Sequence, residues 1–399
     1  MGFLEHSDKY WTFSGQCTQC GHCTKACSSL IAADMTLGQI ANTLLEADRE
    51  AESVDDLRMR IAMNPQLVQA VRGCFFCTSC KNTCFAHNDV CDLIYSARVD
   101  FQNLGLISRD AWSSVLVDQE WDIFTAYRAI HGIGFTDLTR HVATDDHEAA
   151  TDCKVAFFPG CSLAAYGPEL TREIFDTVEQ LGGKATMIDH CCGSPLKSAG
   201  FYERAEALCD RIADELAGSG ASRVVCVCPG CANAMRTTLA RAGLDIEVES
   251  LAGYLASHDF KPKRELPDTP LYISKSCQDR DGTYLQETCD ALGIDRDAPA
   301  IFHGCCGAGG GVSAFDPNRQ SQQADSKLSF APDGATVVSM CPTCTYTYAF
   351  RMMGAPRDLA NKHYTELLFE NQFDWDVVFY QLNSMWSGEY GAWLASVFA

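Results

Sequence analysis

The sequence contains no run of 18 consecutive apolar residues and no long basic segment. The first absence predicts that the chain has no membrane span of its own. The second, with a net charge of −21, argues against nucleic acid and anionic membranes as partners. The stretch from Met1 to His6 also lacks the basic and apolar regions of a secretory signal. We therefore expect a cytoplasmic protein, free or held at the inner face of the membrane through a partner subunit.

Cysteine, by contrast, is abundant, with 23 residues in a chain of 399. In a reducing compartment, clustered cysteines are typically metal ligands or redox groups rather than disulfides. The composition is otherwise ordinary, at 47% hydrophobic and 21% charged residues, and it permits two or three domains with proper cores. The sequence therefore predicts a globular protein whose function resides in its cysteines.

Two tight cysteine runs lie within residues 1–105, each with the spacing Cys-x2-Cys-x2-Cys-x3-Cys. This spacing lets three thiolates on one loop bind three irons of a [4Fe–4S] cube, and in two-cluster ferredoxins the fourth cysteine ligates the other cluster. The first predicted cubane cluster is therefore bound by Cys17, Cys20, Cys23 and Cys84. The second is bound by Cys74, Cys77, Cys80 and Cys27.

Structural zinc is the alternative for these runs, because Cys-x2-Cys pairs also bind zinc. Zinc sites use two such pairs, whereas each run here has three evenly spaced cysteines and a fourth after three residues. Ser28 and Phe85 occupy the positions where proline commonly follows the ferredoxin run. The insert between the runs places Ile40, Leu44 and Leu45 on one helical face. We therefore expect a helical ferredoxin domain rather than a compact β-rich one.

Residues 151–350 contain an internal repeat with three cysteine anchors in the same order. Cys161 corresponds to Cys277, the Cys-Cys-Gly motif at 191–193 to that at 305–307, and the Cys-x2-Cys pair at 228–231 to that at 341–344. Each anchor follows a β-branched or aromatic run typical of a buried strand. Helical patterns follow, in the first copy at 169–181, 202–216 and 232–242. Such an order predicts βαβ units with parallel strands and the cysteines at their carboxyl ends.

Both anchor sets match the motif Cys-x(n)-Cys-Cys-Gly-x(m)-Cys-x-x-Cys of the CCG family. About residues 10–350 resemble the fused catalytic, D-type subunit of heterodisulfide reductase, in which a ferredoxin part precedes two CCG repeats. In that family each complete set holds a non-cubane [4Fe–4S] cluster, and a disulfide binds between the two clusters. The glycines Gly193 and Gly307 would let the backbone approach such a cluster. By this resemblance the ligands are Cys161, Cys191, Cys192, Cys228 and Cys231 in the first set, and Cys277, Cys305, Cys306, Cys341 and Cys344 in the second.

The resemblance implies an iron–sulfur oxidoreductase subunit. Electrons from a flavoprotein, cytochrome or ferredoxin-type partner would pass through two cubane clusters to two non-cubane clusters, or to one non-cubane and another iron–sulfur cluster. There a small disulfide would be reduced or formed. Similar chains also serve flavin dehydrogenases of the glycerol-3-phosphate, glycolate or lactate type, so the alternative is a non-catalytic electron-transfer subunit leading to quinone. Because both five-cysteine sets are intact, we favour chemistry at sulfur.

The predicted fold class is α and α/β, with a helical two-cluster ferredoxin domain before two pseudo-repeated CCG domains. Residues 1–105 form the ferredoxin domain and 106–150 a helical linker. Residues 151–262 and 263–373 form the CCG domains, and 374–399 an aromatic helical tail that packs on a partner or on the chain's own core.

Several reactive residues remain outside these sets. Five cysteines are expected to act as small buried hydrophobes, with Cys91 the candidate exception: Cys91, Cys153, Cys209, Cys226 and Cys289. His190 and His303 precede the Cys-Cys pairs and would act as proton donors, or be satisfied at strand ends. Lys275 and Arg280 flank Cys277 and would meet an anionic substrate, or form surface ion pairs.

Overall fold

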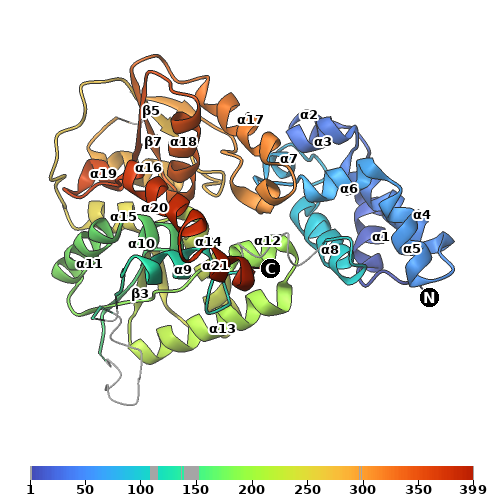
Figure 1. The fold of residues 1–399 in the computed structure, drawn as a ribbon, viewed down its shortest axis with the longest axis horizontal. Helices are drawn as coiled ribbons and strands as arrows, with labels where there is room; N and C mark the ends of the chain where they lie inside the picture. Colours follow the sequence, from blue (N-terminus) through green and yellow to red (C-terminus); the bar gives the residue numbers. More distant parts are fainter. Residues whose placement is uncertain are drawn as a thin grey trace. The chain divides into compact units, whose positions relative to one another are not determined.

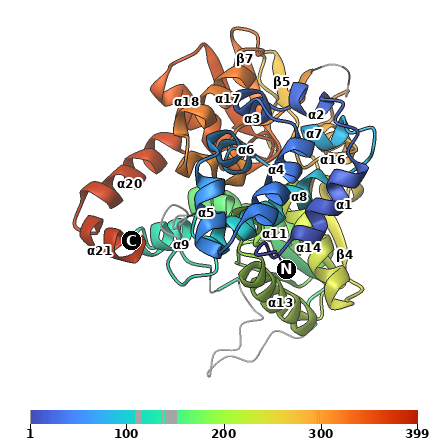
Figure 2. The ribbon, with the colours of Figure 1, turned by 90° about the vertical axis from the view of Figure 1, so that its right-hand side faces the viewer.

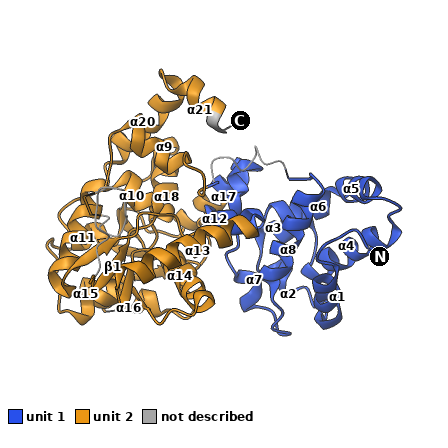
Figure 3. Cartoon of the chain, turned by 90° about the horizontal axis from the view of Figure 1, so that it is seen from below, with its two compact units in different colours: residues 1–116, 195–202, 307–322 blue, residues 117–194, 203–306, 323–399 orange. Residues whose placement is uncertain are grey.

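A computed structural model describes residues 2–107, 116–135, 137–138, 152–295, 297 and 299–398, the side chains up to 396. Much of the predicted linker, at 108–115 and 139–151, lies outside these residues. The chain forms two compact units (Figure 3). Unit 1 comprises residues 1–116, 195–202 and 307–322, and unit 2 comprises 117–194, 203–306 and 323–399.

Unit 1 is helical in its described residues, as predicted for the N-terminal region (Figure 1). Its N-terminal helices are α1 (Ser7–Gln16), α2 (His22–Lys25), α3 (Ser28–Ala33), α4 (Leu37–Glu50), α5 (Val54–Ala62), α6 (Pro65–Arg72), α7 (Ser79–Asn82) and α8 (Val90–Asn103). Thr36 and Gln39 form a capping box that starts α4, which satisfies backbone N–H groups that the first turn leaves free. Ile40 and Leu44 are fully buried in the core, so the predicted apolar face is confirmed.

Two later segments complete unit 1. They contain most of α12 (Ser194–Ala199), the 3-10 helix η2 (Gly309–Ala314) and the first half of α17 (Pro317–Leu328). Ala199 lies in the hydrophobic core of the N-terminal helices, and Phe201 and Phe315 pack against it. Both segments follow a Cys-Cys-Gly motif in the sequence, so the residues after these motifs are part of the helical unit.

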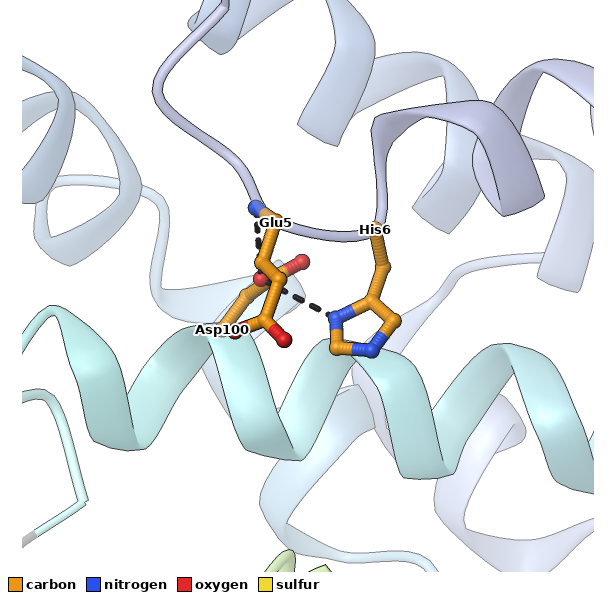
Figure 4. Close-up of side chains that lie close together, drawn as sticks. All are labelled: Glu5, His6 and Asp100. Carbon is orange, nitrogen blue, oxygen red and sulfur yellow. Dashed lines mark hydrogen bonds and ion pairs between the residues drawn. The ribbon is translucent and has the colours of Figure 1, made fainter.

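The carboxylate of Asp100 in α8 anchors the N-terminus of the chain (Figure 4). It accepts a hydrogen bond from the backbone N–H of Glu5 at 3.0 Å, and its Oδ1 lies 3.3 Å from Nδ1 of His6. Tyr10 donates its hydroxyl to the other oxygen. Burial is the main reason why the pKa of Asp100 is raised. The close approach of Glu5, His6 and Asp100 is therefore explained by hydrogen bonds that hold the start of the chain on α8.

Unit 2 contains two four-stranded sheets in which every pairing is parallel. The first has the order β2-β1-β3-β4 and the second β6-β5-β7-β8. Their bounds are β1 (Val155–Phe158), β2 (Ala185–Met187), β3 (Arg223–Cys226), β4 (Glu247–Ser250), β5 (Leu271–Ser274), β6 (Ala300–Phe302), β7 (Ala335–Ser339) and β8 (Leu359–His363). The repeat of parallel βαβ units is thus confirmed, with the same strand order in both copies.

Unit 2 also contains helices, several of which contact the strands. They are α9 (Ile123–Ile130), α10 (Cys161–Tyr166), α11 (Pro168–Gly182), α13 (Tyr202–Ser219), α14 (Pro229–Ala242), α15 (Leu251–Ser257), α16 (Thr283–Leu292), the rest of α17, α18 (Pro342–Gly354), α19 (Thr365–Leu368), α20 (Trp375–Ser387) and α21 (Gly391–Phe398). In α11, Pro168 occupies the first turn, and Leu170, Ile174 and Val178 are fully buried. The three helices predicted for the first repeat correspond to α11, α13 and α14.

The two repeats contact each other through α15 with α16 and through α10 with α18. The aromatic tail forms α20 and α21, and α20 contacts both α9 and α18 (Figure 2). Its Val378 and Met385 are buried, so the tail packs on unit 2. Across the described ranges, none of the helices is both long and apolar enough to cross a bilayer.

Candidate metal centres

The first candidate centre is a cavity in unit 1. Its lining includes four thiols together with the apolar side chains of Phe13, Leu37, Phe85 and Val90. The four cysteines are Cys17, Cys20, Cys23 and Cys84. Cys84 comes from the second run yet lies with three cysteines of the first run, which is the crossed grouping predicted for a two-cluster ferredoxin.

The two cysteine runs adopt the same unusual backbone. In the first run, Gln19 has φ 53° and Gly21 has φ 75°. At the equivalent positions of the second run, Phe76 has φ 52° and Thr78 has φ 61°. A short helix then follows in each case, α2 or α7. Non-glycine residues seldom adopt positive φ. The repeated conformation therefore indicates that each loop is shaped to turn its own three thiols toward a centre of its own.

The second candidate centre in unit 1 is more buried. The pKa of Cys74 is raised to about 12, first by burial and also by the nearby Cys27 and Cys77. Burial and the same neighbours raise the pKa of Cys80. Neighbouring thiols that ionise together carry an unfavourable negative charge, unless a cation binds among them. This donor set fits a thiolate-bound iron centre, and its assignment to a cubane cluster stays a prediction.

In unit 2, the first five-cysteine set lies at the carboxyl edge of the first sheet. Cys161 begins α10 after β1, and Cys191 and Cys192 follow β2. Cys228 caps α14 after β3, and Cys231 lies in the first turn of that helix. Thiol–thiol hydrogen bonds join Cys161 to Cys191, Cys191 to Cys192, Cys192 to Cys231 and Cys228 to Cys231. The structure therefore brings all five predicted residues into one connected group.

The second set repeats this arrangement at the second sheet. Cys277 follows β5, Cys305 and Cys306 follow β6, and Cys341 caps α18, with Cys344 in its first turn. The sulfurs of Cys344 and Cys306 lie 3.0 Å apart, and Cys341 also bonds to Cys344.

Tyr348 and Gln278 are neighbours of the cysteines in the second set. Cys305, Cys306 and Cys344 all raise the pKa of the buried Tyr348, after burial itself. The Cys277 thiol accepts a weak hydrogen bond from Gln278, with 4.0 Å between Sγ and Nε2. Cys277 therefore shares the strand edge with the other four cysteines, while its sulfur is held by the neighbouring amide.

One contact joins the two sets. The sulfurs of Cys228 and Cys341 lie 3.5 Å apart. The two residues hold equivalent places, each as the cap of a helix that has proline in its first turn. A helix N-terminus stabilises a thiolate through its N–H groups and dipole. The two five-cysteine groups therefore meet directly at their helix-capping members.

This duplicated arrangement coincides with a known family. Residues 155–236 and 273–348 each match CCG, described as the cysteine-rich domain. The two repeats of this chain are similar to the CCG domain. Both matched segments contain a complete anchor set, the first with β1 to β3 and the second with part of β5 and with β6 and β7, so the matches fall on the two sheet-bearing repeats of unit 2.

The chain is also similar to whole redox subunits. It is 24% identical over 363 residues to the D-type subunit of the dihydromethanophenazine:CoB–CoM heterodisulfide reductase of Methanosarcina acetivorans, a match that covers 82% of this chain and 86% of that protein. Identity to the corresponding subunit of Methanosarcina mazei is 23% over 361 residues, with the same coverage. The B-type subunit of the fumarate reductase (CoM/CoB) of Methanothermobacter marburgensis is 24% identical over 204 residues, 48% of this chain and 40% of that protein. These relatives are subunits of oxidoreductase complexes, and with the CCG domains they support iron–sulfur clusters as the cofactor.

The glycines of the two CCG motifs have a backbone reason to be glycine. Gly193 has φ 74° and Gly307 has φ 85°, a region that side chains strain. A Cβ at Gly160 would lie 3.2 Å from the sulfur of Cys231, so this glycine also keeps the first set open. The cofactor-binding role of Gly193 and Gly307 stays a prediction, while their conformation explains the residue type.

The polar residues beside the motifs have structural partners. His190 bonds through Nε2 to Glu215 at 2.7 Å, and this bond is the main reason why its pKa is raised. Lys275 lies 3.9 Å from the carboxylate of Asp279. Cys226 and Cys289 are fully buried. The structure thus supplies a packing or pairing reason for these side chains.

One residue near a candidate centre was not predicted from the sequence. Arg98 is fully buried in α8 and donates to the carbonyl oxygen of Cys74 at 2.9 Å. The sequence alone could have indicated this residue, because Arg98 lies on the same apolar face of the helix as Ile94, Ala97 and Phe101. A charged residue on a buried helix face calls for a specific explanation.

Proposed function

We propose that this chain is the iron–sulfur subunit of a heterodisulfide-reductase-like oxidoreductase, and that it reduces or forms a small disulfide at the junction of its two CCG domains. The observation that carries the proposal is the 3.5 Å approach of Cys228 and Cys341, which joins two complete five-cysteine sets. A disulfide has two sulfur atoms, and two adjoining thiolate-rich metal sites offer one binding position for each.

When bound by the two five-cysteine sets, the clusters would supply single electrons and a metal with affinity for sulfur. The chain's own residues supply the remaining requirements. Cys228 and Cys341 cap the N-termini of α14 and α18, a position where the helix dipole favours the ionised sulfur that metals bind. Burial of Cys191, Cys192 and Cys306 limits water at the centres. Disulfide reduction consumes two electrons and two protons and yields two thiols.

The thiols of unit 1 fit the proposed route for electrons. The cavity lined by Cys17, Cys20, Cys23 and Cys84 and the group around Cys74 are proposed to hold two cubane clusters. Cys20 and Phe85 of that cavity are exposed, so a redox partner could approach there. A flavoprotein, cytochrome or ferredoxin-type subunit is the proposed partner.

A viologen assay tests the activity. The anaerobically purified chain should oxidise reduced viologen when small disulfides are added, and Cys341→Ser should abolish this reaction. Cys289→Ser is the matched control, because Cys289 is buried in α16 outside both sets. If the wild-type chain, fully loaded with iron, accepts electrons but reduces none of the disulfides, the electron-transfer alternative leading to quinone replaces the proposal.

A further inference from the structure

Arg98 is a buried cation in the helical unit. It is 0% exposed, on a helix, α8, whose Leu93, Ile94, Ala97 and Phe101 are also buried. Burial of a charge is costly unless the surroundings compensate it. Burial lowers the pKa of Arg98 to about 10, so the guanidinium remains charged at neutral pH.

The guanidinium is held by five backbone carbonyl groups. Nε donates to Val71 at 3.1 Å, and Nη2 donates to Arg72 and Cys74 at 2.9 Å each. Nη1 donates to Ser198 at 2.5 Å and to Gly310 at 2.7 Å. Carbonyl oxygens satisfy N–H donors but carry no net charge, so these bonds fix the position of the cation and leave its charge in place.

The acceptors come from three separate segments. Ser198 and Gly310 lie on the two segments that continue the chain from the Cys-Cys-Gly motifs. A Cβ at Gly200 would lie 3.0 Å from the backbone of Arg98, and one at Gly310 would overlap the carbonyl of Cys74. The close approach therefore requires glycine at both positions. Arg98 ties both continuing segments to the backbone of the second cysteine run.

The cation also acts on the second candidate centre. Its charge lowers the pKa of Cys74, in opposition to the dominant effect of burial. Its Cζ lies 4.8 Å from the ring centre of Phe76, and Phe76 stacks on Tyr95 at 4.1 Å. The bonds and the ring together confine the charge beside a thiol that is a predicted ligand.

We propose that Arg98 is a positioning residue whose fixed positive charge raises the reduction potential of the cluster bound by Cys74, Cys77, Cys80 and Cys27. The proposal rests on the proposed iron–sulfur function. On reduction, one electron from the redox partner adds one negative charge to this centre, and no bond forms or breaks. A nearby buried cation favours that extra charge.

Neutral replacements of Arg98 test the proposal. Arg98→Met and Arg98→Gln should lower the equilibrium constant for one-electron reduction about tenfold, which is about 59 mV. Arg98→Lys keeps the charge with fewer donors, so it should restore most of the potential. Arg60→Gln is the control, because Arg60 is a surface arginine paired with Asp56 and Glu50.

Redox titration of the full chain followed by EPR supplies the readout. Cys20→Ser, which removes a ligand only from the other predicted set, assigns the two cubane signals. The expected result is a lower potential for the second centre alone. An unchanged potential in a loaded neutral variant, or an equal shift of both centres, overturns the proposal. The proposal is also overturned if both neutral variants fail to bind the cluster while Arg98→Lys binds it at an altered potential. Arg98 would then have a structural role.

The two proposals fail in different ways. If the wild-type chain binds no [4Fe–4S] cluster, the proposed function is wrong. If the wild-type signals are present and the reduction potential of the second centre does not change when the charge at position 98 is removed, only the inference about Arg98 is wrong.

Discussion

The Gly38→Ala substitution should selectively damage the site proposed for the first cubane cluster. Gly38 lies in the first turn of α4, and a Cβ built there would lie 2.7 Å from the sulfur of Cys17. Nonbonded carbon and sulfur atoms need roughly 3.5–4.0 Å, so the sulfur must retreat by about 1 Å. Metal–ligand distances tolerate about 0.2 Å. The displacement is therefore several times larger than a thiolate ligand can absorb.

Gly15→Ala is the matched control for this substitution. Gly15 lies in α1, shortly before Cys17, and among the described atoms nothing lies within 4 Å of its added Cβ. Alanine favours a helix over glycine by up to about 1 kcal/mol, so neither variant should lose helical structure. Any difference between them then reports the contact with Cys17.

Iron analysis, EPR and circular dichroism measure the outcome. Gly38→Ala should lose about four irons per chain, equivalent to one cube, with an unchanged helical spectrum. Gly15→Ala should retain its iron. A Gly38→Ala protein with full iron and an unaltered signal from the first centre would refute the reasoning, because Cys17 would then not be held as a ligand against α4.

Two further predictions concern stability. Gly310→Ala should lower the free energy of unfolding by about 1–3 kcal/mol more than Gly243→Ala does. Both glycines have positive φ, of 67° and 69°, but only a Cβ at position 310 would overlap the carbonyl of Cys74. Equal losses of stability in urea unfolding would contradict this prediction. For Glu173, burial alone would raise the pKa, but hydrogen bonds from the backbone N–H groups of Asn371 and Glu370 and from Lys263 lower it overall. A lowered pKa stabilises the fold above the unfolded value of about 4.3 and loses this effect as pH falls through the folded value. Glu173→Gln should therefore reduce Tm at neutral pH, and its deficit should shrink below about pH 4; a deficit independent of pH would argue against the charge.

The sequence predicted the elements that carry cysteines. Each strand that precedes an anchor has an apolar run, such as Val155–Phe158, and all of these strands form with the cysteine at the carboxyl end. The pattern did not indicate β4 and β8, because Glu247–Ser250 and Leu359–His363 are mostly polar and lie at the edges of their sheets. Edge strands need no continuous apolar run, so they leave a weak signal.

The spacing of the cysteines led to a predicted grouping of the thiols, but it carried no information on contacts between groups. The crossed position of Cys84 is a prediction from the ferredoxin spacing, and Cys84 lines one cavity with Cys17, Cys20 and Cys23. The approach of Cys228 to Cys341 depends on how α10 packs on α18 and α15 on α16. The binding of Ser198 and Gly310 by Arg98 likewise arises from tertiary packing over long sequence separations.

Iron and sulfide analysis with EPR of the anaerobically purified chain tests the central claim most directly. The account predicts about 16 irons and about 16 sulfides per chain, as four [4Fe–4S] clusters, with two distinct cubane signals after reduction and separate signals from the two CCG sites. A colourless chain that holds zinc and no iron would contradict it.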